Sequence, residues 1–130
     1  MTTPILTILL KDRFTGCFAF VEALVGTLGY KLEHPVTGKI TYWTSDGTKL
    51  EVSREGVEDV GAQNVQFWQS PSDDLFVSWT GTSSGFRFSF HLNGLPVELR
   101  LALANALVQA VLTDLRSQFC EECAFQIEFD

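Results

Sequence analysis

The hydrophobic residues fall into strand-like and helix-like patterns along the chain. Residues 5–10 form a short apolar run, ILTILL, which ends at Lys11 and predicts a buried strand. Between Thr15 and Leu28 the apolar residues recur at helical spacing, and Gly29 is well placed to end a helix there. The N-terminal part of the chain therefore predicts a strand followed by a helix.

A hairpin signal follows at Asp46 and Gly47, which separate two alternating segments. An Asp-Gly pair in this position is typical of a two-residue type I′ turn. Such a turn places Trp43 opposite Leu50 on one face of the hairpin. We therefore expect two short strands here, joined with that register.

The strongest pattern is a meander of three strands at residues 65–69, 74–80 and 85–91, joined by two polar loops. If each loop holds four residues, one face is aromatic and apolar and should be the core: Trp68, Leu75, Val77, Trp79, Phe86, Phe88 and Phe90. The opposite, outer face is mixed: Val65, Phe67, Phe76, Ser78, Arg87, Ser89 and His91.

A long helix is predicted from Pro96 to about Gln118, since Pro96 suits a first helical turn and Glu98 complements the helix dipole. Apart from one narrow polar stripe, this helix is apolar nearly all round, so it should be covered on more than one side. The cover is either the first helix or a second subunit. Residues 124–129, AFQIEF, alternate and predict a final strand.

Together these elements predict an α+β fold. We expect an antiparallel sheet of about five to seven strands, with a β-meander at its centre and two helices packed on one face. The 130 residues suffice for one hydrophobic core and show no repeat or linker. A single domain over residues 1–130 follows.

The formal net charge of −7 is the most informative global property. Acidic residues concentrate between Asp46 and Asp74 and again from Asp114 to Asp130. Such a surface repels phosphate backbones and anionic lipids, so we expect neither nucleic-acid nor membrane binding. It would attract a basic protein partner, although an acidic surface also serves solubility alone.

The sequence also indicates a compartment. No apolar stretch reaches a membrane-spanning length, and the N-terminus lacks the basic and small-residue pattern of a signal peptide. Three cysteines, an odd number, fit a reducing environment better than a disulfide framework. We expect a cytoplasmic protein.

The segment FCEEC, with Cys120 and Cys123, raises three alternatives: a redox dithiol, half of a zinc site, or two small residues at a turn. The pair follows a helix C-terminus and encloses Glu121 and Glu122, both of which disfavour a thiolate. Paired partner ligands for zinc are also missing from the sequence. We favour the turn, with reduced thiols, no metal and no cofactor.

A second motif, GTSSG at residues 81–85, formally matches the nucleophile elbow G-x-S-x-G. That elbow needs a helix after the turn, whereas the residues that follow Gly85 alternate like a strand. His91 is the only histidine downstream of Ser83, and no acid lies between them. We interpret the segment as a hairpin loop and expect no enzymatic activity.

Three functions remain open. The first is an acidic protein-binding module, namely an inhibitor or immunity-type protein that docks on a basic partner. Its expected partner-binding residues combine exposed acids with aromatic anchors: Tyr42, Glu55, Glu58, Asp59, Phe67, Asp73 and Asp74.

The second function is a homodimeric acidic secretion chaperone, with the dimer formed through the helix from Pro96 to Gln118. The third is a small ligand-binding or enzymatic domain that uses the outer sheet face, with Phe67, Phe76, Arg87 and His91 as the expected site.

Overall fold

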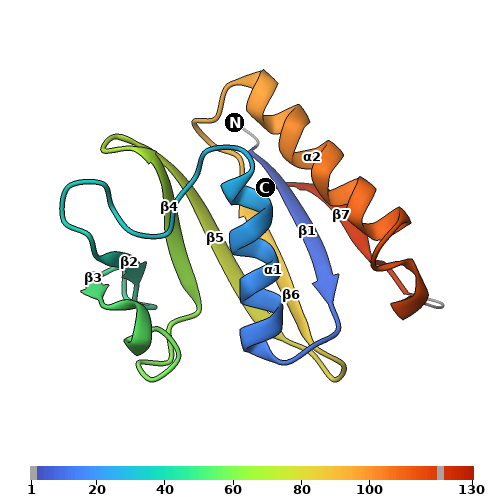
Figure 1. Cartoon of the computed structure of the whole chain (residues 1–130), viewed down its shortest axis with the longest axis horizontal. Helices are drawn as coiled ribbons and strands as arrows, with labels where there is room; N and C mark the ends of the chain where they lie inside the picture. Colours follow the sequence, from blue (N-terminus) through green and yellow to red (C-terminus); the bar gives the residue numbers. More distant parts are fainter. Residues whose placement is uncertain (1–2, 120–121) are drawn as a thin grey trace.

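The structure is a computed structural model that describes residues 3–119 and 122–130. Eleven elements follow one another in these residues, and Figure 1 labels the strands and the two α-helices: β1 (Pro4–Leu10), α1 (Phe14–Gly26), β2 (Ile40–Trp43), β3 (Lys49–Val52), η1 (Arg54–Gly56), β4 (Asn64–Ser70), β5 (Asp73–Gly81), β6 (Phe86–His91), α2 (Val97–Leu112), η2 (Arg116–Gln118) and β7 (Phe125–Phe129).

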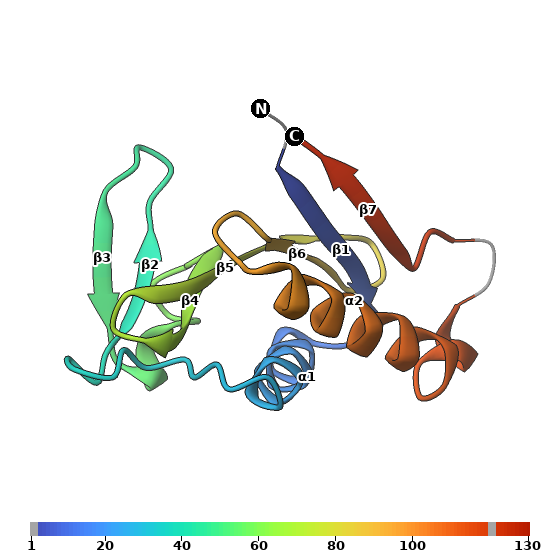
Figure 2. The ribbon, with the colours of Figure 1, turned by 90° about the horizontal axis from the view of Figure 1, so that it is seen from above.

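Five of the strands form one antiparallel sheet in the order β4-β5-β6-β1-β7, while β2 and β3 form a separate two-stranded sheet. Both helices lie on the same side of the large sheet, as the view from above shows (Figure 2). The predicted α+β class and the antiparallel sheet of at least five strands are therefore confirmed, with the meander β4-β5-β6 forming one side of that sheet. The second helix is shorter than predicted: α2 ends at Leu112, and the short helix η2 follows.

The core lies between the helices and the sheet. The N-terminal strand β1 inserts between β6 and β7, so that Leu6 and Ile8 stand opposite Phe90 and Phe88. All four side chains are at most 2% exposed. The first helix covers this face with Phe14 and Phe18, whose rings lie 5.1 and 5.7 Å from that of Trp79. Burial of this aromatic wall is the main force holding helix and sheet together.

The register of β4 differs from the prediction by one residue. A β-bulge lies between Trp68 and Ser70, so that Trp68 pairs with Asp74 and Ser70 with Asp73. The turn between β4 and β5 therefore contains two residues, not the predicted four. Because side chains alternate with a period of two, the extra residue reverses the faces of β4. Phe67 is fully buried in the core, and its predicted place on the outer face is wrong.

Trp68 accordingly lies on the outer face, and its predicted place in the core wall is also wrong. It is nevertheless 8% exposed, since the segment before β2 crosses it. Lys31 pairs with Trp68 as an isolated bridge, and the ring of His34 meets the indole edge-on at 4.5 Å. The predicted faces of β5 and β6 are correct, with Leu75, Val77, Trp79, Phe88 and Phe90 all buried.

The hairpin of β2 and β3 also has a different register: Tyr42, not Trp43, stands opposite Leu50. The predicted type I′ turn needs positive φ at both central residues, but only Gly47 has one, at 87°. The loop therefore holds one residue more, and the backbone N–H of Thr44 bonds the carbonyl of Thr48 across it. A single added turn residue again explains the changed register.

A side chain attaches this hairpin to the large sheet. The backbone N–H of Trp43 donates to Oδ1 of Asn64 at 2.7 Å, and Nδ2 of Asn64 donates to the carbonyl of Trp43 at 2.9 Å. The side-chain amide of Asn64 thus forms with Trp43 the two hydrogen bonds that the backbone of a neighbouring strand would form. The indole Nε1 of Trp43 adds a bond to Oε1 of Gln66 at 3.1 Å. This attachment joins β2 to β4 and so holds the small sheet beside the large one.

Across the described residues, neither helix combines the length and the hydrophobicity needed to span a bilayer.

The segment GTSSG forms the hairpin loop between β5 and β6, and its two glycines differ sharply in their surroundings. A Cβ on Gly85 would overlap the carbonyl oxygen of Leu10 and lie 2.8 Å from Cα of Lys11, whereas a Cβ on Gly81 would meet only Phe86 at 3.8 Å. We predict that Gly85→Ala lowers the free energy of unfolding by about 2–3 kcal/mol, because two backbones would have to separate.

Urea unfolding followed by tryptophan fluorescence measures this change. Gly81→Ala is the matched control, and it should alter stability by no more than about 0.5 kcal/mol. Equal effects of the two substitutions would contradict the close backbone approach at Gly85.

Candidate functional site

A groove between α1 and η1 combines apolar walls with an acidic rim. Its volume is about 270 Å³, and ten residues line it: Phe14, Thr15, Phe18, Ala19, Glu22, Leu32, Arg54, Glu55, Val57 and Glu58. Three of them are carboxylates and one is a guanidinium. The groove therefore offers both a surface for apolar side chains and an excess of negative charge.

The apolar walls come from elements that the fold brings together. The aromatic rings of Phe14 and Phe18 project from α1 and stack on each other, with centroids 5.5 Å apart. Leu32 follows α1, and Val57 follows η1; they are 1% and 6% exposed. Both therefore anchor their loops in the core, which leaves the polar neighbours of Val57 at the surface.

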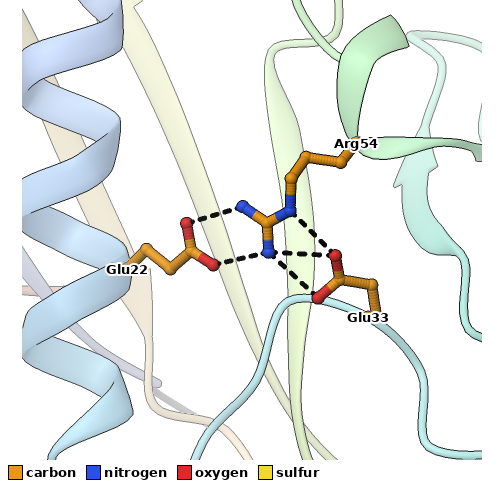
Figure 3. Close-up of polar contacts among 3 residues, drawn as sticks. All are labelled: Glu22, Glu33 and Arg54. Carbon is orange, nitrogen blue, oxygen red and sulfur yellow. Dashed lines mark hydrogen bonds and ion pairs between the residues drawn. The ribbon is translucent and has the colours of Figure 1, made fainter.

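One arginine ties the two sides of the groove together (Figure 3). Nη1 and Nη2 of Arg54 donate to the carboxylate of Glu22 on α1, at 3.0 and 2.8 Å. Nε and Nη2 of the same guanidinium donate to Glu33 at 2.9 and 3.0 Å. Paired bonds of this kind hold their partners in a defined geometry. The three side chains are called the Arg54 clamp below.

Because Arg54 is bound to Glu22 and Glu33, it does not neutralise the other carboxylates of the rim. Its hydrogen bonds to Glu22 raise the pKa of Arg54, and the charges of Glu22 and Glu33 raise it further, against some desolvation. The guanidinium therefore stays charged and committed to two carboxylates. Glu55, Glu58 and Asp59 are exposed beside it and keep the rim negative.

The structure brings some of the predicted partner-binding residues together and separates others. Glu55 and Glu58 line the groove and Asp59 follows them, while Tyr42 lines a neighbouring depression with Val60. Sequence reasoning overlooked Phe14, Phe18 and Glu22, whose helical spacing of four residues placed them on one side of α1. The sequence did not predict that these residues line a groove, because the groove forms only where η1 packs against that side of α1.

The remaining predicted residues lie elsewhere. Phe67 is buried and offers no surface to a partner. Asp73 and Asp74 lie at the opposite end of β4, which is seven residues long. At about 3.3 Å per residue, this strand separates the two acidic groups by about 20 Å. The acidic surface that seemed continuous in the sequence is thus divided in two.

The outer sheet face holds a different arrangement. A depression of about 390 Å³ is lined by Thr3, Ile5, Asp74, Phe76, His91, Asn93 and Asp130. The rings of Phe76 and His91 meet edge-on at 5.0 Å, and Nε2 of His91 lies 3.1 Å from Oγ of Ser78. Desolvation lowers the pKa of His91 and the charge of Asp130 opposes this, with desolvation the larger effect.

The alternative ligand site was predicted from four residues, and only two of them meet here. Phe76 and His91 are in contact, whereas Phe67 faces the core. Arg87 lies four positions from His91 along β6, and its Nη1 donates to the carbonyl of Cys123 at 3.3 Å. The predicted site is therefore not assembled as a unit.

The cysteine motif is only partly described, since Cys120 and Glu121 lie outside the described residues. Cys17 and Cys123 are free thiols; Cys17 is buried, and desolvation raises its pKa. Glu122 pairs with Nζ of Lys11 at 2.5 Å. In the described residues, no three histidine, cysteine or acidic side chains are grouped so as to hold a metal ion.

Comparison with protein families, with curated proteins and with solved structures found no match to this chain.

The Arg54 clamp predicts a measurable stabilisation. Arg54→Met keeps the aliphatic stem but leaves Glu22 and Glu33 facing each other without a cation, and should cost about 1 kcal/mol of unfolding free energy. Arg54→Lys should lose most of the same amount, because an ammonium cannot form two paired contacts. Urea unfolding at low and high salt is the measurement, and the loss should shrink at high salt.

Lys39→Met removes the same charge from an exposed loop position and is the matched control. If its effect equalled that of Arg54→Met, general charge balance rather than the clamp would explain the result.

Proposed function

We propose that this protein is a non-enzymatic binding module that docks on a basic protein, as an inhibitor or immunity-type protein does. The observation that carries the proposal is the groove between α1 and η1, where apolar walls and an acidic rim lie side by side. The occupant that fits is a cationic segment with an apolar side chain next to a lysine or arginine.

Binding would proceed in two physical stages. The negative rim raises the local concentration of a cationic partner and so speeds encounter. An apolar or aromatic side chain then enters between Phe18 and Val57 and loses its contact with water, which supplies most of the affinity. Glu55 and Glu58 would pair with the flanking cations at the edge of the contact.

The chemistry of the groove favours binding over catalysis. Its lining contains carboxylates, a guanidinium and apolar groups, and among the ten lining residues there is no histidine, cysteine or lysine. General acid–base catalysis relies on groups that change protonation near neutral pH. Both oxygens of Glu22 already accept bonds from Arg54.

Two other functions keep some support. A homodimeric secretion chaperone is favoured by the exposed apolar residues on α2, such as Leu101 and Leu112. A small-ligand site is favoured by the contact of Phe76 with His91 in the outer depression. Neither has an arrangement of charge and shape as specific as the groove.

The proposal predicts that reversing the charge of the rim slows the docking of a cationic probe. The probe is a fluorescent synthetic peptide of alternating lysine and phenylalanine, and its binding is followed by anisotropy and stopped flow. Glu55→Lys with Glu58→Lys should lower the association rate about tenfold and flatten its salt dependence. Ala19→Phe, which fills the groove from the exposed side of α1, should weaken equilibrium binding without changing the charge.

The matched control is Asp114→Lys with Glu128→Lys, which changes net charge equally at exposed positions away from the groove. Asp73→Lys tests the other end of β4. If the control pair slowed association as much as the rim pair, binding would follow net charge alone and the groove would have no special role.

A further inference from the structure

A second surface, away from the groove, exposes large apolar side chains on α2 and β7. Six of the nine exposed large hydrophobic residues in the described chain lie on these two elements: Val97, Leu101, Val108, Leu112, Ile127 and Phe129. Four of them are at least 60% exposed. Isolated exposed apolar residues are ordinary, but such a concentration is typical of an interaction surface. These six residues are called the apolar corner below.

The apolar corner lies on the side of α2 that faces away from α1. The residues of α2 next to α1 are Ala106, Gln109, Ala110 and Thr113, which line a depression with Phe20, Ala23 and Leu24. Leu101, Val108 and Leu112 lie on the opposite side of the helix, given 3.6 residues per turn. In Figure 2, β7 lies on this same side, beyond α2 as seen from α1.

The last strand continues the surface. Ile127 pairs with Leu6 and Phe129 with Pro4, so their side chains point to the helix-covered face of the sheet. Leu6 is buried there, whereas Ile127 and Phe129 are 53% and 68% exposed. The cause is that β7 is the edge strand of the sheet, and Phe125 is its one hydrophobic residue that packs against the core. An edge strand with an uncovered apolar flank is a site where further chain tends to associate.

The spacing of the helical residues fits a second copy of the same chain. Val97, Leu101, Val108 and Leu112 are separated by four, seven and four positions, so the pattern reads the same from either end. A two-fold axis beside Ala104 and Asn105 would then place Leu101 of each copy against Val108 of the other. Such self-complementarity is the property that an isologous dimer interface requires.

The charge distribution and the exposure of the apolar corner are both compatible with a second copy of the chain bound there. Each chain carries a net charge of −7, yet no charged residue occurs from Leu101 to Thr113. Along this part of α2, two copies can therefore meet without placing like charges opposite each other. Four of its six side chains are at least 60% exposed, so burying them together would supply a substantial part of the roughly 800 Å² that each partner contributes to a standard interface.

We propose that a second copy of this chain covers the apolar corner, in a two-fold homodimer whose α2 helices run antiparallel. This inference does not depend on the proposed groove, which lies beside α1 and stays open in such a dimer. The dimer presents two grooves at once, so a multivalent basic partner would gain avidity from it.

Sedimentation equilibrium on the purified chain tests the dimer directly. We expect a mass twice that of the 14.5 kDa chain at micromolar concentration. Leu101→Lys with Leu112→Lys should yield monomers, with an association constant lower by at least about a hundredfold. Val36→Lys with Val60→Lys changes two exposed valines elsewhere and should remain dimeric. A wild-type protein that stays monomeric, or a control that dissociates equally, overturns the proposal.

A crosslinking experiment tests the antiparallel arrangement even where the lysine variant folds poorly. In a background with Cys120→Ser and Cys123→Ser, Asn105→Cys lies beside the proposed axis and should form an intermolecular disulfide on mild oxidation. Gln109→Cys lies toward α1 and should not. Crosslinking of Gln109→Cys alone would show that a different face of α2 is paired.

Discussion

The position of β1 between β6 and β7 is the constraint on which the rest of the structure depends. Both edges of this strand are paired, and Leu6, Ile8 and Leu10 bury their side chains against Phe90, Phe88 and Phe86. Backbone groups buried in this way need partners on both sides, so the sheet is complete only when chain ends far apart in sequence have met. The short link after Leu10 then forces α1 onto the core face, and the side of α1 that remains exposed becomes one wall of the groove.

The groove shows how a marginal surface interaction can hold a candidate binding site in place. Exposed ion pairs contribute little stability individually, yet Arg54 contacts two carboxylates from different segments and so holds η1 against α1. The same contact sets the charge of the site, because Glu22 is neutralised while Glu55 and Glu58 are not. The groove on α1 and the apolar corner on α2 and β7 lie on opposite sides of the helical layer, so the proposed partner and the proposed second copy would not compete.

Much of the fold could be predicted from the sequence, because its strongest signals are local. The strand before Lys11, the helix before Gly29 and the faces of β5 and β6 follow from periodicity, which depends only on neighbouring residues. The prediction failed where one residue was added to a turn or a strand. The bulge at Trp68 and the loop at Gly47 each changed the register of a strand pair. Because side chains alternate along a strand, the change in β4 moved Phe67 from the predicted outer face into the core.

By itself, the sequence determined the types of element, the α+β class and the acidic character of the protein. Composition and short-range spacing contain this information. Only the tertiary structure decided which acids act together: it gathered Glu22, Glu55 and Glu58 around Phe18, and it placed Asp73 and Asp74 at the far end of β4. The physical reason is that a site consists of contacts between segments distant in sequence, and these depend on where helix and sheet pack against each other rather than on spacing along the chain.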